Sequence, residues 1–280
     1  MILTEMNHPI IRKGILSSTK IGKNMNEIEE ELFCTKYELK TLADLVLKGE
    51  AERWVKGFLH PKYEIEHIER YRFALQFVNN KNVLDIACGS GYGSFLIAEQ
   101  GNALKVTGVD LDADAVRYGN FRYAHHLVNR FVDDATKFSS ATPFDVIISY
   151  ETVEHLDDYI LFLKNINQNL AEDGTFIIST PISKKTTIKP NHNPYHEIEW
   201  SYSDFTKLLQ EHFILKDTFI QNAVIEGNYP EYTLTNRIKN RLGKRITKSD
   251  PKFFEGIKAA HDLKVEELDA GYIIAVLNKK

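Results

Sequence analysis

Apolar positions along the chain change their period near residue 82. Before that point they recur at the three- and four-residue spacing of an amphipathic helix, in a stripe from Leu39 to Leu47 and again in YEIEHIERYRFALQFV. After it, short β-branched runs alternate with helical stretches. The runs are VLDIA (83–87), KVTGVD (105–110), RFVDD (130–134), FDVIIS (144–149) and GTFIIST (174–180). This alternation predicts right-handed βαβ units and a parallel sheet.

Two further apolar runs complete the predicted sheet: ILKDTFI after Phe213, and GYIIAVLNKK at the end of the sequence. We therefore predict an α/β fold with a Rossmann-like, mostly parallel sheet of seven strands and helices on both faces. The predicted organisation is a loosely held leader (1–24), an N-terminal helical cap (25–80), the core (81–221), a basic helical insertion (222–270) and the final strand (271–280).

A glycine-rich turn follows the first predicted strand. VLDIACGSGYG places Gly89, Gly91 and Gly93 between that strand and a helical stretch. Glycines let a backbone approach a ligand closely, and a helix N-terminus offers N–H groups to an anion. The spacing is G-x-G-x-G, because Ser94 stands where a dinucleotide fingerprint has its third glycine, and this argues against NAD. The turn predicts another nucleotide-type ligand.

Carboxylates follow the next two predicted strands. Asp110 ends the second, where it can accept hydrogen bonds from a ribose diol. Asp133, Asp134 and Ala135 follow the third, where a carboxylate can accept from an adenine amino group and backbone N–H groups can meet ring nitrogens. Each aspartate alone would be read as a helix cap or turn residue. Their order along three strand ends favours a nucleotide site.

Residues 64 to 220 resemble the class I S-adenosylmethionine-dependent methyltransferases, through VLDIACGSGYG, VTGVDLD, VDDA, FDVIISYETVEHL and GTFIISTP. The resemblance implies S-adenosylmethionine as cofactor, with its amino-acid moiety at 85–91, its ribose at Asp110 and its adenine at Asp134 and Ala135. Arg70 would pair with the methionyl carboxylate, and a surface helix charge is the alternative. The implied cofactor contacts are Arg70, Asp85, Ala87, Gly89, Ser90, Gly91, Asp110, Leu111, Asp134, Ala135 and Tyr150.

The segment after the fourth predicted strand, ETVEHL, carries Glu151, Glu154 and His155. Their spacing of i, i+3 and i+4 places all three on one face if the chain enters a helix there. That face lies at the carboxyl end of the sheet, where the methyl group is expected. The alternative is that these acids complement a helix dipole.

A second motif after the fifth predicted strand, HNPYHEIEW, carries His196 and Glu199. Together the two motifs resemble the metal-dependent 2′-O-methyltransferases that modify the 3′ ends of small RNAs. The resemblance implies a divalent metal that holds two vicinal hydroxyls, with ligands Glu151, Glu154, His155 and His196. A bound metal lowers the pKa of a hydroxyl. Imidazole ligands favour Mn²⁺, Fe²⁺ or Co²⁺ over Mg²⁺, although abundance can override this, and we expect Mg²⁺ or Mn²⁺.

The methyl acceptor is predicted from the net charge and from sequence motifs. The net charge of −4 argues against a nucleic-acid partner. One basic cluster (237–248) is either a solvated helix or a lid for a phosphorylated substrate. The sequence also resembles bacterial methyltransferases of surface-glycan and nucleotide-sugar biosynthesis, through the segments EIEHIERYRFA, VLDIACGSGYGS, ETVEHL and NPYHEIEWS. We therefore predict metal-assisted O-methylation of a sugar diol, on a small-molecule or glycan acceptor.

Three alternatives remain at the level of sequence: a metal-free N-methyltransferase of an amino sugar or small amine, a small-RNA 3′-end modifier, and a non-catalytic binding module. The two cysteines, Cys34 and Cys88, give no disulfide framework, which favours a reducing cytoplasm. No apolar run approaches the ~20 residues needed to span a bilayer, so no membrane insertion is expected. The sequence specifies neither the acceptor nor the oligomeric state.

Overall fold

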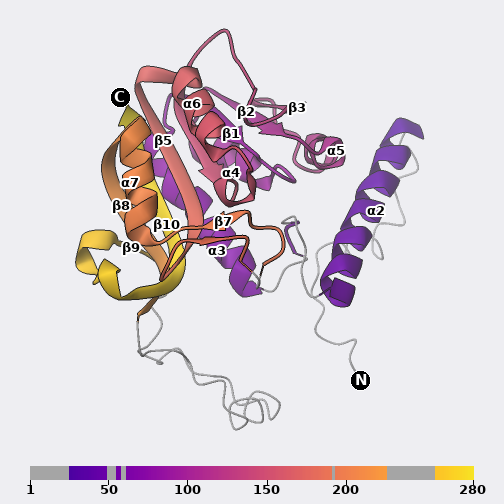
Figure 1. The fold of residues 1–280 in the computed structure, drawn as a ribbon. Coiled ribbons are helices and arrows are strands. Elements are labelled where there is room, and N and C mark those ends of the chain that lie inside the picture. Colours follow the sequence, from indigo (N-terminus) through magenta and orange to yellow (C-terminus); the bar gives the residue numbers. More distant parts are fainter. Residues whose placement is uncertain (1–24, 49–54, 58–60, 191–192, 226–255) are drawn as a thin grey trace.

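The computed structural model describes residues 25–48, 55–57, 61–190, 193–225 and 256–280. Its centre is an eight-stranded sheet in the order β3-β2-β1-β4-β5-β10-β8-β9 (Figure 1). The strands are β1 (Asn82–Ile86), β2 (Lys105–Asp110), β3 (Val128–Val132), β4 (Phe144–Tyr150), β5 (Leu170–Ser183), β8 (Phe213–Ile225), β9 (Ile257–Ala259) and β10 (Leu268–Lys279).

The sheet is parallel from β3 to β5, and β10 runs antiparallel between β5 and β8. The predicted Rossmann-like α/β class is confirmed. The described region adds one strand to the predicted seven, because β9 pairs antiparallel with β8 at the sheet edge. This strand has only three residues, too few for an alternating pattern to be recognised in the sequence.

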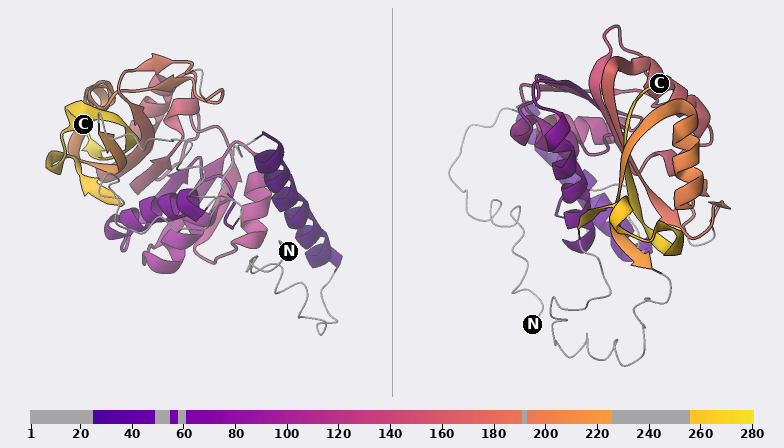
Figure 2. Two further views of the ribbon diagram at one scale, coloured as in Figure 1. Left: turned by 90° about the horizontal axis from the view of Figure 1, so that it is seen from below. Right: turned by 90° about the vertical axis from the view of Figure 1, so that its left-hand side faces the viewer.

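Helices cover both faces of the sheet (Figure 2). One face packs against α6 (Tyr159–Asn169) and α7 (Tyr202–His212) through a core that includes Phe162, Phe205 and Leu209. The other packs against α3 (Pro61–Ala74) and α4 (Tyr92–Gln100) through a core that includes Ala74 and Leu96. α5 (Ala113–Arg122) follows β2. Short 3₁₀ helices lie at η1 (Leu75–Phe77), η2 (Val153–His155), η3 (Ala260–Asp262) and η4 (Val265–Glu267), and β6 (Thr187–Ile188) pairs with β7 (Ile198–Glu199).

The predicted N-terminal helical region contains α3 and a longer helix, α2 (Met25–Lys48). The apolar stripe that predicted α2 is not its buried face: Leu39, Val46 and Leu47 are exposed, whereas Cys34, Glu38 and Thr41 are buried. The predicted leader (1–24) and the basic cluster (237–248) lie outside the described residues. The domain boundaries stay a prediction. Within the described ranges, no helix has both the length and the apolar character that crossing a membrane requires.

Candidate functional site

The glycine-rich turn joins β1 to α4 through left-handed backbone. Ala87, Gly89 and Gly91 have φ angles of 59°, 55° and 81°, and Gly91 is the N-cap of α4. A Cβ added at Gly91 would lie 2.3 Å from Nε of Arg130, whereas one added at Gly89 would meet no heavy atom within 4 Å. Gly91 is therefore needed for packing, while Gly89 presents bare backbone to open space, as a cofactor cradle requires.

Asp110 ties this turn to the end of β2. Its Oδ2 accepts a hydrogen bond from the Gly89 N–H at 2.7 Å, and its Oδ1 accepts from the Asp112 N–H at 3.0 Å. The carboxylate is buried, and Leu111 beside it is 71% exposed. Each carboxylate oxygen can accept more than one hydrogen bond, so Asp110 can hold the turn and still accept from a ribose diol.

Asp85 lies beneath the turn, fully enclosed. Its Oδ1 accepts from the Tyr71 hydroxyl at 3.1 Å and its Oδ2 from the Ser94 hydroxyl at 2.6 Å. Burial raises the pKa of Asp85 to about 6, although both hydroxyl bonds act in the opposite direction. Tyr71 also packs under the turn, because a Cβ at Gly93 would overlap its ring. Sequence reasoning quoted the segments that contain Tyr71 and Ser94 but missed their role, since no spacing in the sequence pairs either of them with Asp85.

Asp134 uses its side chain within its own turn. Oδ1 accepts from both the backbone N–H and the hydroxyl of Thr136, and Oδ2 accepts from Nζ of Lys137 at 2.8 Å. The Lys137 hydrogen bond, followed by those from Thr136, lowers the pKa of Asp134 to about 2. The carbonyl of Ala135 accepts from Asn165 Nδ2 at 2.9 Å. The turn role considered as an alternative is thus observed, and the adenine contact stays a prediction.

Arg70 is 1% exposed, so the alternative of a surface helix charge is wrong. Its Nη1 donates to Oε1 of Gln221 at 2.6 Å, its Nη2 lies 3.1 Å from Nδ1 of His67, and its guanidinium stacks 4.8 Å from the Tyr272 ring centre. Its Nε has no hydrogen-bond partner within the described part of the chain. The hydroxyl of Tyr150 donates to the Arg70 carbonyl at 3.0 Å. Pairing of Arg70 with a methionyl carboxylate stays a prediction.

The ETVEHL segment does not enter an α-helix at Glu151, contrary to that expectation. Glu151 is left-handed at φ 52°, and only η2 follows. The Oε1 of Glu151 accepts from the Ser179 hydroxyl at 2.7 Å. Helical spacing therefore does not place the two glutamates on one face, although Glu151 lies near enough to Glu154 to raise the pKa of that carboxyl.

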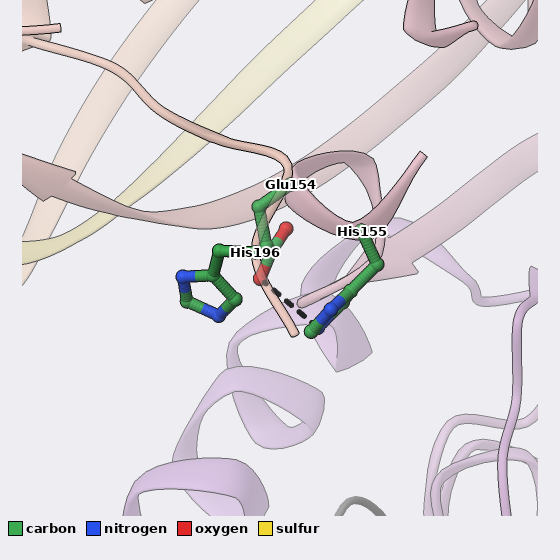
Figure 3. Close-up of side chains that lie close together, drawn as sticks. All are labelled: Glu154, His155 and His196. Atoms are coloured by element: carbon green, nitrogen blue, oxygen red, sulfur yellow. Dashed lines mark ion pairs between the residues drawn. The ribbon is translucent and has the colours of Figure 1, made fainter. Parts of the chain in front are cut away.

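Three of the four predicted metal ligands converge. Glu154, His155 and His196 each offer a ligand atom, and these atoms lie within 4.8 Å of one another (Figure 3). Glu151 is not a member of this group. The two segments meet because the Glu197 N–H donates to the Glu154 carbonyl at 2.8 Å and the Ser183 N–H donates to the Trp200 carbonyl at 2.9 Å.

A hydrogen bond at Nδ1 orients each of the two imidazoles. Nδ1 of His155 lies 2.8 Å from the Tyr195 carbonyl, and Nδ1 of His196 lies 2.7 Å from Oε1 of Glu199. A carbonyl and a carboxylate accept, so each Nδ1 carries the proton and each Nε2 carries the lone pair. Nδ2 of Asn193 donates to Nε2 of His196 at 2.9 Å. The role of Glu199 was missed, although its place three residues after His196 is a signal for it.

Glu154 supplies the remaining atom. Its Oε2 accepts from the Thr180 hydroxyl at 3.0 Å. Its buried Oε1 has no hydrogen-bond partner among the residues that the structure describes, and it lies 4.0 Å from Nε2 of His155. Burial and then repulsion from Glu151 raise the pKa of Glu154 well above its ordinary value. A bound cation would satisfy this buried oxygen, and imidazoles held by a carbonyl or a carboxylate are typical of metal ligands. Glu154, His155 and His196 therefore fit a divalent cation.

Comparisons with known proteins agree on the class of fold and domain. A family model described as a methyltransferase domain matches residues 62–215, more than half of the chain. A probable S-adenosylmethionine-dependent methyltransferase of Mycolicibacterium smegmatis is 29% identical over 170 residues, covering 57% of this chain and 62% of the relative. The ubiquinone biosynthesis O-methyltransferase of Rickettsia typhi is 26% identical over 184 residues, covering 61% of this chain and 74% of the relative.

Among solved structures, the N-methyltransferase NodS from Bradyrhizobium japonicum, in complex with S-adenosylhomocysteine, aligns with a TM-score of 0.54. The alignment has 14% sequence identity and covers 88% of this chain and 98% of NodS. At that identity the likeness concerns the fold. Because the chain spans less than two thirds of the Mycolicibacterium relative, the acceptor of the whole protein does not follow from these comparisons.

Proposed function

Because the chain belongs to the methyltransferase-domain family, whose fold and cofactor are those of the S-adenosylmethionine-dependent enzymes, we propose that it methylates a hydroxyl of a sugar vicinal diol. The acceptor is a glycan or nucleotide-sugar, and the reaction is assisted by a divalent cation such as Mg²⁺ or Mn²⁺. The observation that carries the proposal is the convergence of Glu154, His155 and His196 at the carboxyl end of the sheet.

The strand ends support a place for the cofactor. The open backbone at Gly89 would admit its amino-acid moiety, and Asp110, which holds the Gly89 N–H, would accept from its ribose hydroxyls. Methyl transfer then requires the acceptor oxygen to lie in line with the sulfur–methyl bond and to lose its proton. The bond to sulfur breaks as the bond to oxygen forms, the hydroxyl proton passes to solvent water, and S-adenosylhomocysteine is left.

The cation would be held by one Glu154 oxygen and by Nε2 of each histidine. When bound, it supplies Lewis acidity that lowers the pKa of an acceptor hydroxyl. The chain's own part is to orient the imidazoles through the Tyr195 carbonyl and Glu199, and Asn193 would have to release Nε2 of His196 for a cation to bind there. Trp200, packed at 5.3 Å from Tyr159 and 5.1 Å from Phe205, fixes the segment that carries His196.

A second candidate is a metal-independent N-methyltransferase of an amino sugar or small amine. The observation that favours it is the position of Glu151, which stands outside the group and leaves three ligands rather than four. The buried carboxylate of Glu154 would then orient a cationic amine. A small-RNA acceptor is less favoured, because the net charge is −4.

Metal dependence tests the proposal. Chelation is expected to abolish turnover while leaving S-adenosylhomocysteine affinity unchanged, because the cation acts on the acceptor. His196→Ala should mimic chelation, and Glu199→Gln should weaken Mn²⁺ binding about 10- to 100-fold, as loss of a group that orients a ligand does. Mn²⁺ affinity is measured by calorimetry and turnover by S-adenosylhomocysteine release, with His261→Ala, an exposed histidine outside the site, as the control.

Full turnover in excess chelator, with unchanged Mn²⁺ affinity in both variants, would contradict metal assistance and favour the N-methyltransferase. Acceptor panels then separate the two chemistries: vicinal diols serve the O-methyltransferase, and primary or secondary amines serve the other.

A further inference from the structure

Helix α2 exposes an apolar stripe with the spacing of a coiled coil. Met25, Leu32, Leu39 and Val46 are seven residues apart and are 69%, 54%, 58% and 73% exposed. A second row, Ile28, Thr35 and Leu42, interleaves at three- and four-residue steps, and Ile28 is 48% exposed. These two rows correspond to the a and d positions of a heptad repeat, which we call the α2 stripe.

The stripe does not face the protein's own core. α2 docks on α5 through buried Cys34, Glu38 and Thr41, and through ion pairs from Arg117 and Arg122. At 100° of rotation per residue, the row from Met25 to Val46 lies about 140° around the helix from this docked face, and the row from Ile28 to Leu42 lies about 90° from it. α2 stands at the edge of the molecule beside α5 (Figure 1). The stripe is therefore available to another helix.

We propose that the α2 stripe is a homodimer interface, formed by antiparallel packing against the same helix of a second copy. Met25 of one copy then lies opposite Leu42 of the other, Ile28 opposite Leu39, and Leu32 opposite Thr35. Every layer buries at least one large apolar side chain. A two-fold axis relates the copies, so the arrangement is closed and stops at two.

Charges that flank the stripe select a second copy and its direction. Glu29 and Lys36 occupy equivalent heptad positions beside the stripe, and neither takes part in an ion pair among the described residues. The antiparallel register brings Glu29 of each copy next to Lys36 of the other, twice by symmetry. A parallel register would set Lys36 against Glu31, which is already paired with Arg122 at 2.8 Å. Only the antiparallel arrangement uses both side chains.

Association of the full-length chain, followed by sedimentation velocity from nanomolar to micromolar concentration, tests the interface. Leu32→Lys with Leu39→Lys should raise the dimer dissociation constant by about 100-fold or more, because charge replaces the central layers. Leu47→Lys, on the same helix but outside the stripe, is the matched control. Thr35→Leu should tighten the dimer, since it completes an apolar layer. A misfolded variant could not produce that gain.

Charge reversal tests the register. Glu29→Lys and Lys36→Glu should each weaken the dimer about tenfold or more, and the double variant should restore it. A chain that stays monomeric at every concentration would overturn the proposal. So would a dimer insensitive to the lysine substitutions, whether the stripe is then covered by another part of the same chain or by a different protein. Weakening by Lys36→Glu without any effect of Glu29→Lys would overturn the antiparallel register.

Discussion

Asp85 shows how one buried side chain supports the glycine-rich turn at a cost in stability. Its two hydroxyl partners come from α3 and α4, so the carboxylate links both helices to the end of β1. Neither partner is cationic, and desolvation therefore dominates its pKa, which rises to about 6. Because its pKa is raised, the Asp85 carboxyl is protonated in the folded chain at mildly acidic pH.

The pH dependence of stability follows from that shift. Between the unfolded pKa of 3.8 and the folded pKa of about 6, the folded chain binds the proton and the unfolded chain does not. Stability is therefore lost as pH rises through this window, by about 3 kcal/mol. Asp85→Asn removes the loss while keeping one acceptor oxygen. In urea unfolding without cofactor, the free energy of unfolding of the variant should rise relative to that of the wild type between pH 4 and pH 7. Parallel plots of the two free energies against pH would contradict the assignment.

The residues that the sequence could and could not predict differ in a physical way. Asp110 and the glycines stand at strand ends, where the fold fixes their position. Glu151 follows a strand as well, but its left-handed backbone and its bond to Ser179 depend on a neighbour 28 residues away. Arg70 could be read as a surface charge because its partner, Gln221, lies 151 residues further along the chain. Long-range partners of this kind leave no local pattern.

At the scale of elements, the turn between β1 and α4 separates a packing requirement from a binding requirement. The Cβ of Gly89→Ala would meet no heavy atom within 4 Å, so the substitution costs only the strain of an alanine at a φ of 55°. That strain is about 1 to 2 kcal/mol. Gly91→Ala combines a φ of 81° with a collision at Arg130. We expect Gly91→Ala to lower the melting temperature much more than Gly89→Ala.

Cofactor affinity should follow a different rule. If Gly89 borders the cofactor, its alanine variant should lose S-adenosylhomocysteine affinity by about tenfold or more while staying folded, because the methyl group projects into the open space. Calorimetry on the two variants, beside thermal unfolding, separates the two roles. A folded Gly89→Ala variant with unchanged affinity would move the cofactor away from this turn.

The sequence predicted the secondary structure correctly where a strand is buried on both faces and so forms a continuous apolar run, as in β1, β2 and β4. It gave α2 as a helix but not the face that docks. The docked face of α2 carries Glu38 and Thr41, which are polar, while its most apolar row faces outward. A hydrophobic stripe identifies a surface that binds something, and the identity of the partner is decided by tertiary contacts that the sequence does not display.

The whole molecule is built from unequal packing units. The two faces of the sheet have large apolar cores, whereas α2 is held by a separate small cluster of Cys34, Val55 and Tyr118. A polar network strengthens this attachment: Oε1 of Glu38 accepts from the Tyr118 hydroxyl at 2.9 Å and from Nε of Arg122 at 3.0 Å. Because the apolar cluster that joins α2 to the body is smaller than the cores on the two faces of the sheet, α2 should open independently of the sheet.

Hydrogen exchange tests this hierarchy. Arg122→Ala leaves the buried Glu38 carboxylate without its cation, a loss of about 3 to 5 kcal/mol for a buried pair, and undocking of α2 is the easiest way to rehydrate that charge. Exchange should quicken in Met25–Lys48 and stay slow in β1 and β4. Arg117→Ala is the comparison, because its ion pair with Glu30 is more exposed to solvent and should stabilise the docked helix less than the Arg122 pair does. Both variants are measured in the Leu32→Lys background, so that association does not protect the helix. Equal loss of protection in α2 and the sheet would mean that the molecule unfolds as one unit, and that α2 belongs to the main core.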